Sequence, residues 1–159
     1  MNILFVCSGN VSRSFLAEML LKNEAELHDL DNISVSSAGL LAYPGSPPDP
    51  KMVDYLSKTG IPTKQHKSRQ ITKEDMDWAD FILVMEKDHV RMIEKSWPEI
   101  NSKVELLGNL ISESPSADDI IDPFGESLYH YRLAQSQITL AIRSLVKRVL
   151  SDKSETRSL

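Results

Sequence analysis

Short apolar runs alternate with longer amphipathic segments along the chain. The runs have the length and composition of strands, and the first is typical of a buried parallel strand; they lie at residues 3–6, 33–38, 81–85 and 104–107. Apolar residues recur at helical spacing in the segments between and after these runs, at 12–27, 51–59, 72–79, 87–95 and 131–149. This alternation predicts a single α/β domain with a mostly parallel sheet.

Local signals set several boundaries of these elements. Thr72 is followed three residues later by Asp75, a variant of the capping box that begins a helix, and Gly60 ends the helix over 51–59. Two segments rich in proline and short polar residues are expected to be irregular, at 43–50 and 112–125. The chain becomes polar from residue 151 and should fray there. We therefore expect a domain over 1–151 and a polar tail over 152–159.

Composition and charge exclude several classes of protein. The chain has 159 residues, which suits one domain, and its net charge of −5 argues against a nucleic-acid partner. No apolar run approaches the length of a membrane span, so we expect no membrane partner and a cytoplasmic location. Cys7 is the only cysteine, which excludes an internal disulfide and a multi-cysteine metal site.

The segment after the first predicted strand has the composition of an anion-binding loop. Cys7 and Arg13 are separated by five residues, between a buried strand and an amphipathic helix. A short loop entering a helix can turn its backbone N–H groups inward, where the helix N-terminus adds partial positive charge. Gly9 allows close approach of the backbone, Asn10 tolerates a left-handed conformation, and the planar guanidinium of Arg13 can bind two phosphate oxygens.

The same loop favours attack on phosphorus by a thiolate. The positive field of the loop should lower the pKa of Cys7, and the Ser14 hydroxyl can donate to the sulfur. Cleavage of a phosphate monoester also needs an acid to protonate the leaving oxygen. Asp122 follows two isoleucines and precedes a proline, and it is the candidate acid, although a surface turn is the alternative interpretation. We expect Asp118 and Asp119 to be solvated loop charges rather than metal ligands.

The motifs, taken in order, resemble those of the low-molecular-weight protein tyrosine phosphatases. The similar segments extend along most of the chain; they are residues 3–14, 37–39, 47–50, 60–61, 66–72, 82–85 and 122–125. The resemblance implies a four-stranded parallel sheet flanked by helices, with the phosphate-binding loop between the first strand and the first helix. It also implies hydrolysis of phosphotyrosine through a cysteinyl-phosphate, without a metal or cofactor.

The resemblance assigns roles to individual residues. Cys7 would be the nucleophile, Arg13 the phosphate clamp and Asp122 the general acid. The remaining loop residues would bind the substrate phosphate and shape the loop; they are Ser8, Gly9, Asn10, Val11, Ser12 and Ser14. Tyr43 and Phe124 would form the aromatic walls around the substrate ring.

Two positions of the loop separate this chain from its relatives. Most members of the family have a second cysteine where this chain has Ser12, so their reversible protective disulfide cannot form here. Protein arginine phosphatases, which share the loop, typically have threonine where this chain has Val11, an aliphatic residue that favours phosphotyrosine. The alternatives are an arginine phosphatase, an arsenate reductase using an external thiol, or a non-catalytic phosphate-binding protein.

The resemblance also suggests partners. We expect the substrate to be a protein that contains phosphotyrosine, with tyrosine kinases among the candidates, and we expect the chain to be a monomer or a weak dimer.

Overall fold

Four parallel strands form the centre of the molecule. The computed structural model describes residues 1–63, 65–111 and 118–156. The strands β1 (Asn2–Cys7), β2 (Ser34–Gly39), β3 (Phe81–Val84) and β4 (Val104–Leu106) form one sheet in the order β2-β1-β3-β4. All four lie where the apolar runs predicted them, so the α/β fold with a four-stranded parallel sheet is confirmed.

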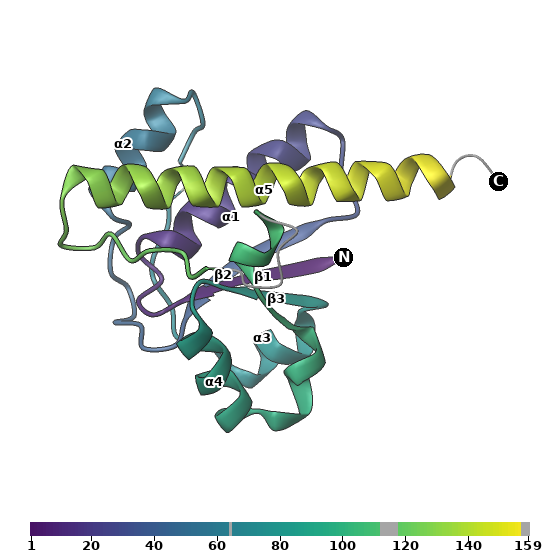
Figure 1. Ribbon diagram of the computed structural model, residues 1–159, viewed down its shortest axis with the longest axis horizontal. Helices are drawn as coiled ribbons and strands as arrows, with labels where there is room; N and C mark the ends of the chain where they lie inside the picture. The colour runs from purple at the N-terminus through teal and green to yellow at the C-terminus, as the bar shows by residue number, and fades with distance from the viewer. Residues whose placement is uncertain (64, 112–117, 157–159) are drawn as a thin grey trace.

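Helices cover both faces of this sheet (Figure 1). Three of them lie on one face, namely α1 (Arg13–Leu27), α2 (Pro50–Lys58) and α5 (Leu128–Thr156). The other face carries α3 (Lys73–Trp78) and α4 (Lys87–Ser96). Two short 3-10 helices flank β4, η1 (Pro98–Lys103) and η2 (Leu107–Leu110). The sequence did not predict them, because one or two turns of helix leave no periodic apolar pattern.

Side chains of β1 alternate between two apolar cores. Ile3, Phe5 and Cys7 belong to the core under α1 and α5, whereas Leu4 and Val6 belong to the core on the side of α3 and α4. Burial on both faces explains why this strand has a continuous apolar run. The alternation also places the Cys7 side chain on the α1 side, at the carboxyl end of the central strand.

The predicted boundaries hold in most places. Thr72 and Asp75 form a reciprocal capping box, in which the Asp75 N–H donates to Thr72 Oγ1 at 3.3 Å and the Thr72 N–H donates to Asp75 Oδ2 at 2.9 Å. Helix α5 continues to Thr156, so the first residues of the expected tail are helical. No proline or glycine occurs over 151–156 to end the helix. Part of the loop expected at 112–125, residues 112–117, lies outside the described residues.

The strand order reverses at β1, at the carboxyl edge of the sheet where its loop begins. β1 lies between β2 and β3, and the chain that leaves it continues into α1 on one face, whereas the chain that leaves β3 continues into α4 on the other. Ligands of open α/β sheets bind at such a reversal of strand order. The loop from Cys7 to Arg13 begins here.

Gly39, the last residue of β2, sets the distance between that strand and the loop. A Cβ atom at this position would lie 2.7 Å from the Ser8 carbonyl oxygen and 3.1 Å from the Asn10 nitrogen. Both neighbours are backbone atoms of the candidate site, so any larger residue must displace the loop.

We predict that Gly39→Ala destabilises the fold by about 2 kcal/mol, because overpacking against a fixed backbone costs about 1–3 kcal/mol. It should also weaken binding of inorganic phosphate. Urea unfolding and calorimetry measure the two effects, with Ser34→Ala at the exposed start of β2 as the control. An alanine variant with unchanged stability and phosphate affinity would contradict the tight packing described here.

Candidate active site

The loop between β1 and α1 turns its carbonyl groups outward. The carbonyl oxygens of four loop residues accept hydrogen bonds from groups outside the loop, at distances of 2.7–2.9 Å. The pairs, acceptor first, are Cys7 with Leu40 N–H, Ser8 with Leu41 N–H, Asn10 with His66 Nε2–H and Val11 with Asp49 N–H. These contacts fix the orientation of each peptide unit.

The N–H groups of these peptide units point the other way, and they find no acceptor in the part of the chain that the structure describes. No residue in the described part of the chain accepts from the loop amides of Ser8, Gly9, Val11, Ser12, Arg13 and Ser14. Successive N–H groups with outward carbonyls, at the start of the 15-residue helix α1, are the backbone arrangement that binds tetrahedral anions.

Ser12 adds a side-chain donor to this set. It stands at the N-cap of α1 but does not cap it, and its Oγ is buried without a hydrogen-bond partner. Within the described residues, no other buried polar side-chain atom lacks a partner. Buried hydroxyls are nearly always hydrogen-bonded, so this one suggests a ligand oxygen or a water in the loop.

Asn10 uses every polar group that it has. Its φ of 57° places it in the left-handed region, and its N–H donates to Cys7 Sγ at 3.3 Å. Its Nδ2 donates to Ser14 Oγ and Ser37 Oγ, both at 2.9 Å, and its Oδ1 accepts from the Arg69 N–H at 3.0 Å. These contacts tie the loop to α1, to β2 and to the segment before α3.

Two hydrogen-bond donors converge on the sulfur of Cys7, a residue that is 3% exposed. Ser14 Oγ lies 3.0 Å from it, and because this oxygen accepts from Asn10, its own proton is directed to the sulfur. The Asn10 N–H is the second donor. Both stabilise negative charge on sulfur, which is the charge that a nucleophilic thiolate carries.

Arg13 is buried with its charge balanced. Its Nη1 donates to Glu86 Oε1 at 2.6 Å and to the Ile120 carbonyl at 2.8 Å, and its Nη2 lies 3.4 Å from Asp122 Oδ2. The guanidinium side chain is 2% exposed, so these partners offset a desolvated charge. The Nε–H has no acceptor among the described residues, which leaves Nε and Nη2 for two oxygens of one phosphate.

The Asp122 carboxyl lies at the edge of this loop. Its side chain is 51% exposed and its Oδ1 accepts from the Phe124 N–H at 3.3 Å. The segment is anchored by Ile120, whose N–H donates to the Met85 carbonyl beside the end of β3. Asp122 therefore contacts both Arg13 and solvent, a position from which a carboxyl group can exchange protons with a bound molecule or with water.

Tyr43 and Phe124 are the expected wall residues of the site, and both side chains are largely exposed. They are 84% and 62% exposed; Tyr43 follows the end of β2, and Phe124 follows the segment in which the Ile120 N–H donates to the Met85 carbonyl beside β3. Their assignment as walls around a substrate ring stays a prediction.

Sequence reasoning missed several partners of the loop. Glu86 and His89 lie at the start of α4, which follows β3, and Ser37 lies within β2. The signal for the first two was available, because the carboxyl ends of adjacent parallel strands meet at one edge.

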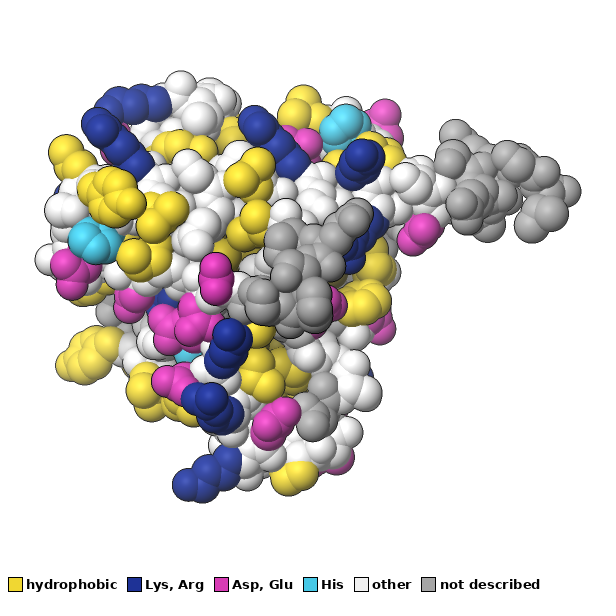
Figure 2. Space-filling model, viewed as in Figure 1, with side chains coloured by type: hydrophobic (Ala, Val, Ile, Leu, Met, Phe, Trp, Pro, Cys, Tyr) yellow, Lys and Arg dark blue, Asp and Glu magenta, His cyan; other side chains and the backbone are white. Residues whose placement is uncertain are grey.

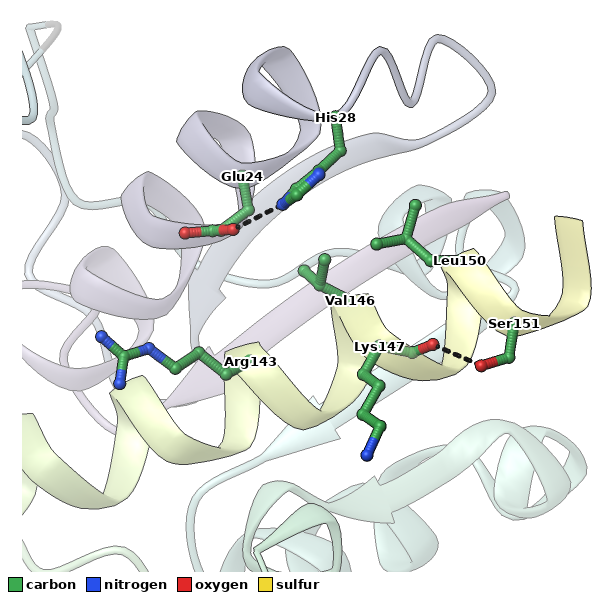
Figure 3. A pocket seen from close by; sticks show the side chains of 7 residues that line it. All are labelled: Glu24, His28, Arg143, Val146, Lys147, Leu150 and Ser151. Atoms are coloured by element: carbon green, nitrogen blue, oxygen red, sulfur yellow. Dashed lines mark hydrogen bonds and ion pairs between the residues drawn. The ribbon is translucent and has the colours of Figure 1, made fainter. Parts of the chain in front are cut away.

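Other surfaces carry different features. A hollow of about 450 Å³ lies between α1 and α5 (Figure 3), and none of the expected site residues lines it; its residues are Glu24, His28, Arg143, Val146, Lys147, Leu150 and Ser151. Figure 2 shows acidic and basic side chains interspersed on the face in view, without a continuous basic patch. Of the helices in the described ranges, none combines the length and apolarity needed to cross a bilayer.

Known proteins share this fold and are similar to this chain in sequence. The chain matches the family described as low molecular weight phosphotyrosine protein phosphatase over residues 2–155. The protein-arginine-phosphatase of Bacillus subtilis (strain 168) is 35% identical over 153 residues, covering 96% of this chain and 99% of that protein. The low molecular weight phosphotyrosine protein phosphatase of Sus scrofa is 32% identical over 154 residues, covering 93% and 95%. A solved structure of the YwlE arginine phosphatase, a C7S mutant with a phosphorylated active site serine, has a TM-score of 0.87 at 33% identity, covering 97% of this chain and 99% of that one.

We predict that removing the Asn10 side chain disrupts the loop. Asn10→Gly should lower the free energy of unfolding by about 2 kcal/mol, because buried Ser14 and Ser37 lose their donor. Asn10→Ala should lower it by about 1 kcal/mol more, because alanine is disfavoured at positive φ. Urea unfolding measures both, with exposed Asn32→Ala as the control. Wild-type stability in the alanine variant would contradict this account.

Proposed function

The chain belongs to the low molecular weight phosphotyrosine protein phosphatase family and is a phosphatase, and we propose that it hydrolyses protein phosphotyrosine through a cysteinyl-phosphate intermediate, with an S–P bond to Cys7. The observation that carries the proposal is the loop itself. Amides without an acceptor among the described residues, the Nε–H of Arg13 and a sulfur with two donors occur together at the carboxyl end of β1.

The first step transfers the phosphoryl group to sulfur. The Cys7 thiolate attacks phosphorus in line with the ester oxygen, so the S–P bond forms as the P–O bond breaks. Asp122 gives its proton to the departing tyrosine oxygen. The loop amides and Arg13 hold the equatorial oxygens, where charge is stabilised by fixed donors rather than by a metal ion.

The second step releases phosphate. A water molecule attacks phosphorus, Asp122 takes its proton, and the S–P bond breaks to restore the thiolate. The phosphorylated active site serine of the YwlE mutant is the corresponding covalent state of that protein. It supports a phosphorylated nucleophile in this chain.

Val11 favours an aryl ester as the substrate. Its aliphatic side chain offers no hydrogen bond to a guanidinium group or to a water beside it, and it can pack against an aromatic ring. The arginine phosphatase of Bacillus subtilis is nevertheless 35% identical, so phosphoarginine is the second candidate. Proteins that contain phosphotyrosine, tyrosine kinases among them, are the proposed partners, and the cytoplasm is the proposed location because it keeps a lone thiol reduced.

We predict that substitution of each catalytic group lowers kcat by a different factor, in assays that contain EDTA. Cys7→Ser should lower kcat by at least about 10³-fold, because the nucleophile is lost. Asp122→Asn should lower kcat by about 10²-fold on a phosphotyrosine peptide, since general acids contribute about 10²–10⁴-fold. The loss on para-nitrophenyl phosphate should be smaller, because nitrophenolate leaves without a proton.

Asp118→Asn is the matched control, since this exposed carboxylate lies in the same segment. Equal losses on the two substrates for Asp122→Asn would remove Asp122 as the acid. A reduced wild-type protein that binds phosphate but turns over neither substrate would favour a non-catalytic binding protein. Reduction of arsenate with an added thiol would favour the reductase.

We predict that Val11→Thr shifts substrate choice toward phosphoarginine by about tenfold, the equivalent of one well-placed hydrogen bond to a charged group. The readout is the ratio of kcat/KM for a phosphotyrosine peptide to that for a phosphoarginine peptide. Threonine and valine have nearly the same shape, so the fold is unchanged. A wild type that already prefers phosphoarginine would overturn the assignment of phosphotyrosine.

A further inference from the structure

A buried histidine connects the two ends of the phosphate loop. His89 lies in the first turn of α4 and is 2% exposed. Its Nε2 is 3.0 Å from Ser8 Oγ, beside the nucleophile at the start of the loop. Its Nδ1 accepts from the Glu86 N–H at 3.2 Å, and Glu86 holds Arg13 at the end of the loop.

These contacts fix the tautomer of the ring. A backbone N–H can only donate, so Nδ1 of His89 carries a lone pair and the proton sits on Nε2. The Nε2–H therefore donates to Ser8 Oγ. Ser8 keeps its own hydroxyl proton, for which the described residues provide no acceptor.

We propose that His89 is a positioning residue of the phosphate loop, and that its neutral Nε2–H form holds Ser8 directly and Arg13 through Glu86. The inference rests on the proposed function in one respect, namely that this loop binds a phosphate group. Nothing in the reaction itself requires a proton from His89.

Protonation of the ring would undo both contacts. A proton on Nδ1 would face the Glu86 N–H, and that hydrogen bond would be lost. The imidazolium would also attract Glu86 Oε2, which lies 3.6 Å from Nε2, in competition with Arg13. Phosphate binding should therefore weaken when His89 becomes charged.

The groups around His89 determine the pH at which its ring becomes protonated, and they favour protonation only in acid. Burial lowers the pKa of His89 below its usual 6.5, and the charge of Arg13 on α1 lowers it further. Glu86 on α4 and the carboxylates of Asp119 and Asp122 before α5 oppose this shift. The ring is therefore neutral near neutral pH, and the contacts to Ser8 and Glu86 are lost only in acid, below the ordinary pKa of histidine.

Two substitutions separate the contacts of the ring. His89→Asn keeps an acceptor near Nδ1 for the Glu86 N–H but cannot reach Ser8. His89→Gln carries an amide N–H that can reach Ser8 Oγ, and it does not titrate. Ser8→Ala removes the other partner of the same hydrogen bond.

The experiment measures the Kd of inorganic phosphate by calorimetry from pH 5 to 7.5. At pH 7, Ser8→Ala and His89→Asn should each raise Kd about fivefold, the equivalent of one hydrogen bond, and the double variant should raise it no further. His89→Gln restores the donor to Ser8 but not the acceptor for the Glu86 N–H, and it is the reference that does not titrate at position 89. The wild-type Kd should then rise relative to that of His89→Gln as the pH falls below 6.5.

Two results would overturn the proposal. In one, the effects of Ser8→Ala and His89→Asn multiply in the double variant. In the other, the ratio of the wild-type Kd to the His89→Gln Kd stays constant from pH 5 to 7.5. Where His89→Asn is too unstable to measure, the pH dependence of the ratio of the wild-type Kd to the His89→Gln Kd is the deciding measurement. Loss of turnover with phosphate binding intact would reject the proposed function and leave this inference standing.

Discussion

The hydrogen bonds of Asn10 hold together the part of the structure on which everything else depends. One side chain in the left-handed conformation joins α1 through Ser14 and β2 through Ser37, while its Oδ1 holds the backbone of Arg69. Its N–H points at the sulfur of Cys7. The peptide units on either side can then turn their N–H groups inward, because the outward carbonyls are already bound. The chemistry of the loop is thus a consequence of backbone geometry.

This arrangement has a cost in stability that a ligand can offset. Donors without acceptors are unfavourable, and the loop holds a buried Ser12 hydroxyl and several amides for which the described residues provide no acceptor. Arg13 is also buried, and it is tolerated because Glu86 and the Ile120 carbonyl bind its Nη1. A phosphate group supplies the missing acceptors and a balancing charge. Binding should therefore stabilise the fold as well as place the phosphorus above Cys7.

The features that the sequence predicted correctly depend on local patterns of residues. The four strands, the capping box at Thr72 and Asp75 and the loop from Cys7 to Arg13 are encoded by residues close together in the chain. The links from Arg13 to Glu86 and from Ser8 to His89 join residues more than seventy positions apart. No periodicity reveals such pairs, and only the order of the strands brings them together. The end of α5 was missed because polar composition does not stop a helix that lacks a breaking residue.

The central claim is that the phosphoryl group passes through the sulfur of Cys7. The direct measurement is an acid quench of the wild-type enzyme during its first turnovers of a labelled phosphotyrosine peptide, followed by mass spectrometry of the digested protein. The expected result is a phosphorylated peptide that contains Cys7, and no other labelled peptide. Turnover without any labelled protein, or with the label on a different side chain, would contradict it.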